Sequence, residues 1–261
     1  MKKVTTLFAL AALAGGSALA AVESDNIVGF QEFTGTGSFN LTVATFLPVG
    51  TDGSGMTLSN IVGNANFVPG TDYVNIYNGG TFLMDVTYSD PVDAAGWGIE
   101  PGWYGVTDYN NDAEHNLNTS PLPYGVGFAF APVTTGAGIK YVGELKQADN
   151  TLPASGTFNL CGNTSPKEIT LANIKGNAEF VPGTDYVNLY NGGTFVIDIT
   201  YSDPTDAASW GIDPGWYGVT DYNNDAETNL NSTPIPAGGG FAFARTTTGA
   251  RLIIENPVPQ N

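Results

Sequence analysis

The chain contains one long segment twice. Residues 64–114 return 113 positions later as residues 177–227, and the two segments differ at only eight of their 51 positions. This period is longer than the roughly 20–50 residues of a solenoid repeat, and it has the size of a small domain. The duplication therefore predicts two copies of one domain in tandem.

Weaker similarities extend the repeat toward the N-terminus. Val142–Glu144 resembles Val28–Phe30, and Gly156–Leu160 resembles Gly37–Leu41. These matches predict a first β-domain within residues 21–141 and a second within residues 142–261. A unit of about 115 residues is long enough to bury its own hydrophobic core.

The first 20 residues have the pattern of a secretory signal peptide. Lys2 and Lys3 precede the apolar stretch Val4–Leu13, and small residues at Ser17–Ala20 offer a cleavage site near Ala20. The apolar stretch is too short for a membrane helix, and no later segment has 18 consecutive apolar residues. We expect a secreted protein, extracellular or on the cell surface, without a membrane span.

The chain is strongly acidic. Its formal net charge of −17 becomes −19 when Lys2 and Lys3 are removed with the signal peptide. Nucleic-acid binding depends on Lys and Arg, so no nucleic-acid partner is expected. Such a surface is compatible with divalent cations, but solvation alone also accounts for it.

Cys161 is the only cysteine. An exported chain with one cysteine has no internal disulfide, so each domain depends on its core for stability. We favour a buried free thiol; an intermolecular disulfide is the alternative.

Strand signals dominate the sequence. Only 13% of residues are charged, and 34 Gly and 16 Pro interrupt any helical periodicity. The clearest signal is a hairpin in which Tyr73–Tyr77 and Thr81–Tyr88 flank Asn78-Gly79-Gly80, and the second copy repeats it at 186–201. Further strands are expected at Ile27–Phe33, Ser38–Phe46, Met56–Val62, Trp103–Thr107, Val126–Ala131 and Ile139–Leu145.

Alternation assigns the faces of this hairpin. Val74 and Ile76 of its first strand, with Phe82, Met84, Val86 and Tyr88 of its second, fall on the predicted core face. About eight short strands per unit predict an all-β protein, consisting of two tandem antiparallel β-sandwich or partly open barrel domains.

Three motifs in each unit resemble a known group of proteins. They are an opening V-G-F or V-G-E strand, the strand T-D-Y-V-N-[IL]-Y-N-G and a late P-x-G-x-G-F-A-F strand (Pro123–Phe130 and Pro236–Phe243). The chain resembles secreted, largely uncharacterised β-rich repeat proteins of the Verrucomicrobia–Lentisphaerae group of bacteria. The resemblance implies an exported β-domain and assigns no catalytic residue. Thr71, Thr184, Ala129 and Ala242 depart from its commonest residues.

Each unit contains a run of oxygen-bearing side chains with alternate spacing. The residues are Asp108, Asn110, Asp112 and Glu114, and in the second unit Asp221, Asn223, Asp225 and Glu227. Ca²⁺ prefers six to eight oxygen ligands and tolerates irregular geometry. The run lacks the glycine and final glutamate of an EF-hand, so a local Ca²⁺ loop completed by Asp90, Asp93 or a backbone carbonyl is one interpretation. Asx-turns in a connecting loop are the other.

All four tryptophans lie in one Gly- and Pro-interrupted segment of each unit. The aromatic residues are Trp97, Trp103 and Tyr104, and in the second unit Trp210, Trp216 and Tyr217. If exposed, they would form a ligand-binding face on which sugar rings stack. Alternatively, they pack a loop over the end of the domain, with each indole N–H bonded locally.

The sequence gives little support for catalysis. His115 is the only histidine, and Thr228 replaces it in the second copy. No nucleophile motif or metalloprotease motif is present. A carboxylate pair for glycoside hydrolysis depends on three-dimensional spacing that the sequence does not give. We therefore expect a protein that is not an enzyme.

Two functions remain. The leading hypothesis is a non-catalytic structural or cell-surface protein, stabilised by calcium and able to self-associate through the edge strands Ile27–Phe33 and Ile139–Leu145. The alternative is a bivalent module that binds a cell-surface glycan or another ligand through the two Trp segments.

Overall fold

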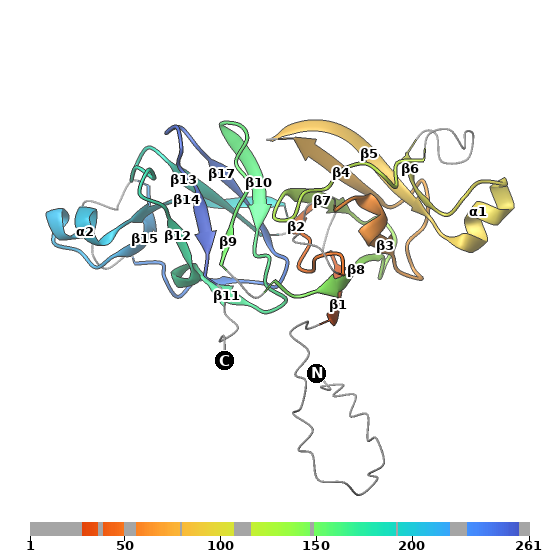
Figure 1. Cartoon of the computed structure of the whole chain (residues 1–261), viewed down its shortest axis with the longest axis horizontal. Coiled ribbons are helices and arrows are strands. Elements are labelled where there is room, and N and C mark those ends of the chain that lie inside the picture. The colour runs from red at the N-terminus through yellow and green to blue at the C-terminus, as the bar shows by residue number, and fades with distance from the viewer. Residues whose placement is uncertain are drawn as a thin grey trace, which may run out of the picture.

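The computed structural model describes residues 28–35, 39–49, 56–78, 80–106, 116–146, 149–191, 193–219 and 229–255. Every strand pairing among them is antiparallel, and the only α-helices described are two short ones. The predicted all-β class is therefore confirmed. The two repeats lie next to each other along the long axis of the molecule (Figure 1).

The first repeat has one large and one small sheet. The large sheet has the order β2-β7-β4-β5-β6 and the small one β1-β8-β3. Their elements are β1 (Val28–Thr34), β2 (Asn40–Val43), the 3₁₀ turn η1 (Leu58–Asn60), β3 (Ile61–Gly63), β4 (Tyr73–Asn78), β5 (Thr81–Ser89), α1 (Pro91–Trp97), β6 (Gly102–Gly105), β7 (Gly127–Ala131) and β8 (Gly138–Glu144).

The second repeat has the same plan. Its large sheet has the order β10-β17-β13-β14-β15, its small sheet β12-β18-β9, and β11 pairs with β16. The elements are β9 (Asn150–Thr151), β10 (Phe158–Gly162), β11 (Ile169–Thr170), η3 (Leu171–Asn173), β12 (Ile174–Gly176), β13 (Tyr186–Asn191), β14 (Thr194–Ser202), α2 (Pro204–Trp210), β15 (Gly215–Gly218), β16 (Pro234–Ile235), β17 (Gly240–Ala244) and β18 (Leu252–Ile254).

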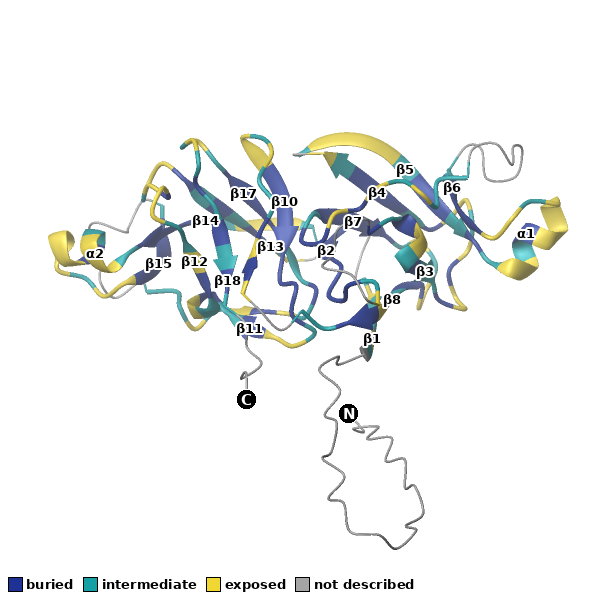
Figure 2. Cartoon of the chain, in the orientation of Figure 1, coloured by how far each residue is buried: buried dark blue, intermediate teal, exposed yellow. Residues whose placement is uncertain are grey.

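Each repeat has its own core between its sheets (Figure 2). In the first repeat, Val74, Val86 and Phe128 of the large sheet pack in one cluster with Ile61 and Ile139 of the small sheet. An equivalent cluster occupies the second repeat. Burial of these side chains is the main favourable term for folding each repeat.

The pairing shows where the first repeat ends. β8 pairs with β1 as far as Glu144, opposite Val28, so a boundary at residue 141 would fall inside this strand. Val142–Glu144 is therefore not a second copy of Val28–Phe30; the two segments lie opposite each other in one sheet. The equivalent of β1 in the second repeat is the short strand β9, because Thr151 pairs with Ile253 as Glu32 pairs with Lys140.

One of the two predictions of an edge strand is wrong. Ile139–Leu145 corresponds to β8, which lies between β1 and β3 and is paired on both sides. The sequence pattern identified the strand, but its neighbours come from segments about 80 and 110 residues earlier, which local periodicity does not reveal. Only the first predicted strand, β1, lies at a sheet edge.

The two repeats meet through the first strands of their large sheets. Leu41 and Ala129 form a third buried cluster with Leu160 and Ala242. The contacts are reciprocal: a Cβ atom on Gly127 would lie 2.8 Å from the carbonyl carbon of Leu160, and one on Gly240 would lie 2.5 Å from that of Leu41. Glycine at both positions allows the close approach of the backbones.

Polar contacts reinforce one side of this junction. Thr42 Oγ1 donates a hydrogen bond to the carbonyl oxygen of Gly238 at 2.8 Å, and the amide of Val43 donates to the same oxygen at 3.1 Å. The Nε2 of Gln31 also donates to the Ala237 carbonyl at 3.2 Å. The loop that precedes β17 therefore bonds directly to β2 of the other repeat.

The arrangement of sheets differs from the two β-sandwich or partly open barrel domains that the sequence predicts. The strands are divided among five sheets, and the outer faces of β2 and β7 are covered by β10 and β17 of the other repeat. Strand patterns report which faces are apolar, but they do not report which segment covers each face. Among the described residues, no helix has the length and apolar character to cross a membrane.

Candidate functional site

Each aromatic segment begins with a short helix that the sequence analysis missed. Asp90 caps α1, because its Oδ1 accepts hydrogen bonds from the amides of Val92 and Asp93, both at 2.8 Å. Pro91 occupies the first helical position, and Gly98 ends the helix in the left-handed conformation. Asp203 caps α2 in the same way. The signal was the sequence Asp-Pro followed by Gly seven residues after the proline.

Trp97 and Trp210 end these helices and are exposed to solvent. Trp97 is 52% exposed and Trp210 49%. The two helices lie at opposite ends of the long axis (Figure 1). These two indoles are therefore accessible, and they are far apart on the molecule.

The other predicted ligand-binding aromatics are buried. Trp103 is enclosed by Phe67 and Tyr88, with ring centroids 6.0 and 5.4 Å away, and its Nε1 donates a hydrogen bond to the Ile61 carbonyl at 2.7 Å. The hydroxyl of Tyr104 donates to the Glu100 carbonyl at 2.6 Å. Both belong to the hydrophobic interior.

The second copy repeats these contacts. Trp216 Nε1 donates to the Ile174 carbonyl at 2.7 Å, and the hydroxyl of Tyr217 donates to the Asp213 carbonyl at 2.6 Å. The expectation of an exposed face formed by all six aromatics is therefore wrong for Trp103, Tyr104, Trp216 and Tyr217. Each apolar ring is covered by its own core while its polar atom finds a backbone partner.

The predicted calcium loops lie outside the described residues. This applies to Asp108, Asn110, Asp112 and Glu114, to Asp221, Asn223, Asp225 and Glu227, and to His115. The two residues expected to complete the calcium site have structural roles. Asp90 caps α1, and Asp93 accepts a hydrogen bond from Ser89 Oγ at 2.6 Å. Within the described ranges, no group of three His, Cys, Asp or Glu side chains is placed to hold a metal ion.

Two buried carboxylates organise the loops next to β7 and β17. Asp72 Oδ1 accepts hydrogen bonds from the amides of Val133 and Thr134 at 2.7 and 2.8 Å, and its Oδ2 accepts one from Val68 at 2.8 Å. Asp185 makes the same three contacts in the second repeat. Backbone amides satisfy these charges, so both carboxylates fix the fold.

Cys161 is a buried free thiol, as predicted. It lies in β10 opposite Phe241 of β17, and burial raises its pKa above the ordinary value for cysteine. A thiol that remains protonated and inaccessible is a poor nucleophile.

The tips of the two long hairpins carry an exposed apolar surface that the sequence pattern did not predict. Phe82 is 50% exposed and its counterpart Phe195 51%, although alternation assigned Phe82 and Met84 to the core face. A bulge between Ile76 and Tyr77 changes the register of the β4–β5 hairpin, and its tip extends beyond the core. The signal was the consecutive apolar run Phe82-Leu83-Met84, since a strand with one buried face alternates.

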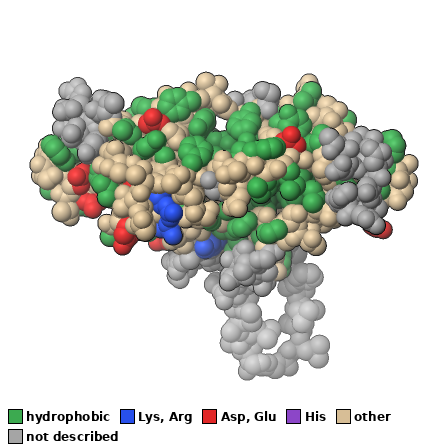
Figure 3. Space-filling model, turned by 90° about the horizontal axis from the view of Figure 1, so that it is seen from above, with side chains coloured by type: hydrophobic (Ala, Val, Ile, Leu, Met, Phe, Trp, Pro, Cys, Tyr) green, Lys and Arg blue, Asp and Glu red, His purple; other side chains and the backbone are tan. Residues whose placement is uncertain are grey.

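We refer to the exposed apolar residues of these tips as the hairpin surface. It consists of Phe82, Leu83 and Met84 on β5 and Phe195 and Val196 on β14. Each tip reaches the other repeat: Gly80 lies against Phe158 at the start of β10, and Gly193 lies against Phe39, just before β2. Seen from above, hydrophobic side chains cover much of the middle of the molecule, with few charged groups among them (Figure 3).

No family model, curated protein or solved structure matches this chain. The resemblance to secreted β-rich repeat proteins therefore stays a prediction.

Proposed function

We propose that this is a non-catalytic, exported structural protein of the cell surface that self-associates through its hairpin surface. The observation that carries the proposal is that the same positions expose large apolar side chains in both repeats, as Phe82 and Phe195 do. Contiguous exposed apolar patches commonly mark interaction sites.

The charge of the chain favours contact at this surface. Two copies of the mature chain, each with a formal charge of −19 after the removal of Lys2 and Lys3, repel one another, so a contact should bring together surfaces with few charges. Phe82, Leu83 and Met84 form an uncharged run on β5. Screening of the remaining charges by salt should strengthen such an association.

The placement of the hairpins also supports growth into larger assemblies. The two tips belong to different repeats of one chain and each lies against the other repeat. A chain with two equivalent contact surfaces can bind two neighbours, and contacts that do not close into a ring extend into fibres or layers. Calcium at the Asp/Asn loops, one of the two interpretations of these segments, would reduce the negative charge.

The test is sedimentation velocity at increasing protein and salt concentrations. We expect the purified mature chain to form oligomers, and a F82S/F195S double variant to remain monomeric. V92S is the matched control, because Val92 is 82% exposed on α1 but lies outside the hairpin surface. A parent chain that stays monomeric in high salt, with and without Ca²⁺, would overturn the proposal.

A second candidate is a bivalent carbohydrate-binding module, favoured by the exposure of Trp97 and Trp210. Because the two indoles lie at opposite ends of the molecule, simultaneous binding requires a long polymer or a surface with many glycans. Tryptophan fluorescence titrated with a panel of polysaccharides tests it. W97A/W210A should abolish the response and leave the melting temperature unchanged, whereas an undiminished response would exclude these residues.

A further inference from the structure

The duplication places two equivalent grooves at the junction of the repeats. Each is lined by the tip of one long hairpin and the first strand of the other repeat's large sheet. The first groove is lined by Tyr77, Gly80, Val126, Gly127, Pro153, Asn159 and Leu160. The second groove is lined by their counterparts, in the same order Tyr190, Gly193, Gly239, Gly240, Thr34, Asn40 and Leu41.

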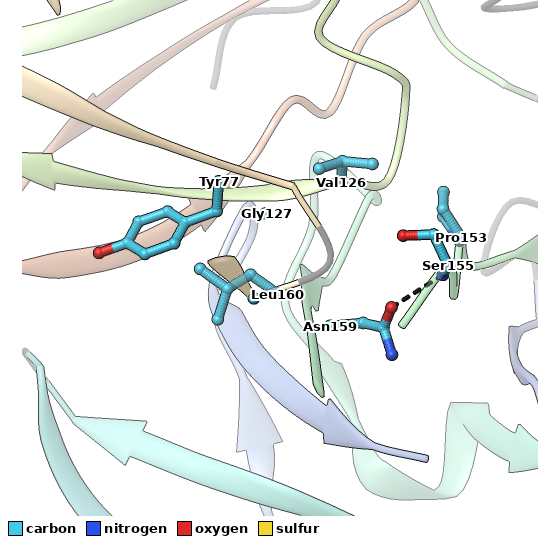
Figure 4. Close-up of a pocket in the computed structure, with 8 residues that line it drawn as sticks. Tyr77, Val126, Gly127, Pro153, Ser155, Asn159 and Leu160 are labelled. Carbon is cyan, nitrogen blue, oxygen red and sulfur yellow. Dashed lines mark hydrogen bonds between the residues drawn. The ribbon is translucent and has the colours of Figure 1, made fainter. Parts of the chain in front are cut away.

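The first groove is almost filled. It retains a cavity of about 20 Å³, which has room for about one water molecule. Val126 and Pro153 lie on one side of Leu160, and the Oδ1 of Asn159 accepts a hydrogen bond from the Ser155 amide at 2.8 Å (Figure 4).

The second groove is open and has a cavity of about 520 Å³. Gly239 stands where the first groove has Val126, and Thr34 where it has Pro153. The side chain is therefore smaller at Gly239, whereas Thr34 and Pro153 are of similar size. A volume of this size falls within the range of small-molecule binding sites, roughly 300–1,000 Å³.

The lining of the open groove defines the chemistry of its ligand. None of its fifteen residues is Asp, Glu, Lys, Arg or His, although the chain has 25 acidic residues. Phe33, Leu41, Val196 and Ile235 provide apolar walls. An ionised ligand would lose its hydration here without gaining a charged partner, so an uncharged ligand is favoured.

A few polar groups accompany these walls. Asn191 and Thr233 lie on the second-repeat side, and Tyr190 belongs to the same lining. Apolar walls with a small number of polar groups are typical of sites that orient one flat or ring-bearing molecule. The rings of Phe33 and Tyr190 are suited to pack against such a molecule.

We propose that the groove between β2 and the β13–β14 hairpin binds one uncharged, largely apolar, ring-bearing small molecule. The site shares Val196 with the hairpin surface, but Gly239, which distinguishes it from the filled groove, does not belong to that surface. The first groove, which is equivalent but almost filled, serves as an internal comparison.

The experiment uses Nile red, an uncharged dye that fluoresces in apolar surroundings, with the mature chain. We expect saturable binding of one dye per chain and at least tenfold weaker binding to G239V. A Cβ atom on Gly239 would lie 3.0 Å from the Pro236 carbonyl oxygen, so the substitution needs a small local shift. Val126 occupies the equivalent position after the equivalent proline, Pro123. Its amide bonds to that proline's carbonyl at 3.0 Å, as the amide of Gly239 does to Pro236 at 2.9 Å, so the turn accepts a valine.

Two further variants keep the test decisive. T233W fills the groove from its rim, so it should also weaken the binding of Nile red even if G239V unfolds. F82S should bind the dye as the parent chain does, because Phe82 packs on Tyr77 of the filled groove. Unsaturable binding, unchanged binding by folded G239V and T233W, or loss of binding in F82S alone would overturn the proposal; the last outcome would place the dye on the hairpin surface.

Discussion

Trp103 donates its indole hydrogen bond to the carbonyl oxygen of Ile61 at 2.7 Å, across 42 residues of chain. This bond joins β6 of the large sheet to β3 of the small sheet. Trp216 and Ile174 are joined in the same way in the second repeat. Two elements of different sheets are thus held in register by one side chain in each repeat.

Replacement of Trp103 by Phe should lower the free energy of unfolding. It leaves the buried Ile61 carbonyl without this donor, which costs about 1–3 kcal/mol, and adds the loss of part of a buried ring. Urea unfolding measures the change. The exposed Trp97→Phe is the control and should change stability by less than about 0.5 kcal/mol; equal effects of the two would contradict the burial of Trp103.

Asp72→Ala should lower the free energy of unfolding more than the loss of one hydrogen bond would. Three backbone amides lose their acceptor, and each unsatisfied buried donor costs about 1–3 kcal/mol. We expect a loss of several kcal/mol, with a similar loss for Asp185→Ala. Thermal unfolding followed by circular dichroism provides the measurement, and a shift of only a degree or two for both would show that the amides find other partners.

The two repeats should unfold together while their junction is intact. Gly127→Ala places a Cβ atom 2.8 Å from the Leu160 carbonyl carbon, so the backbones must separate. We expect calorimetry to resolve two transitions in G127A where the parent chain shows one. Gly96→Ala is the matched control, because nothing lies within 4 Å of its Cβ atom and alanine favours the helix by about 0.5–1 kcal/mol.

Stability should fall in alkaline solution. Burial raises the pKa of the Tyr124 phenol from its ordinary 10.0 to about 12 and also raises that of the Cys161 thiol. Both groups stay protonated in the folded chain at a pH where the unfolded chain ionises. Their contribution is therefore complete below about pH 9 and is lost toward pH 12, by about 1.4 kcal/mol per pH unit and group.

Urea unfolding at a series of pH values gives this profile. A thiol reagent should modify Cys161 only after unfolding. Rapid modification of the native chain would contradict its burial.

Calcium should raise the melting temperature if the Asp/Asn loops bind it. A ligand that binds only the folded state stabilises it by about 2.7 kcal/mol at a hundred times its dissociation constant. Differential scanning fluorimetry with Ca²⁺ and with a chelator tests this. A D108N/D112N/D221N/D225N variant should lose the difference, and equal melting of the parent chain in both solutions would remove the calcium site.

Local patterns predicted some features well. The Asn-Gly hairpin at Asn78, the buried thiol of Cys161 and the all-β class all follow from short-range chemistry. The helix capped by Asp90 was missed because an apolar periodicity was sought, whereas a helix of seven residues depends on its caps. The signal peptide and calcium loops lie outside the described residues and stay predictions.

Long-range relationships were not predictable from these patterns. Burial of Trp103 depends on Phe67 and Tyr88, which come from other segments. Exposure of Phe82 depends on where the core ends. The open groove at Gly239 depends on how one repeat docks on the other. Its only indication in the sequence is the small residue at the position equivalent to Val126.

The reciprocal packing of Gly127 and Gly240 gives the molecule the contacts of a homodimer within one polypeptide. In a homodimer of identical subunits, every substitution occurs on both sides of the symmetry axis. Here each side is encoded separately, so Thr42 on one side corresponds to Cys161 on the other, and Val126 to Gly239. Covalent linkage thus frees one half of the junction to specialise while the other half keeps the two repeats together.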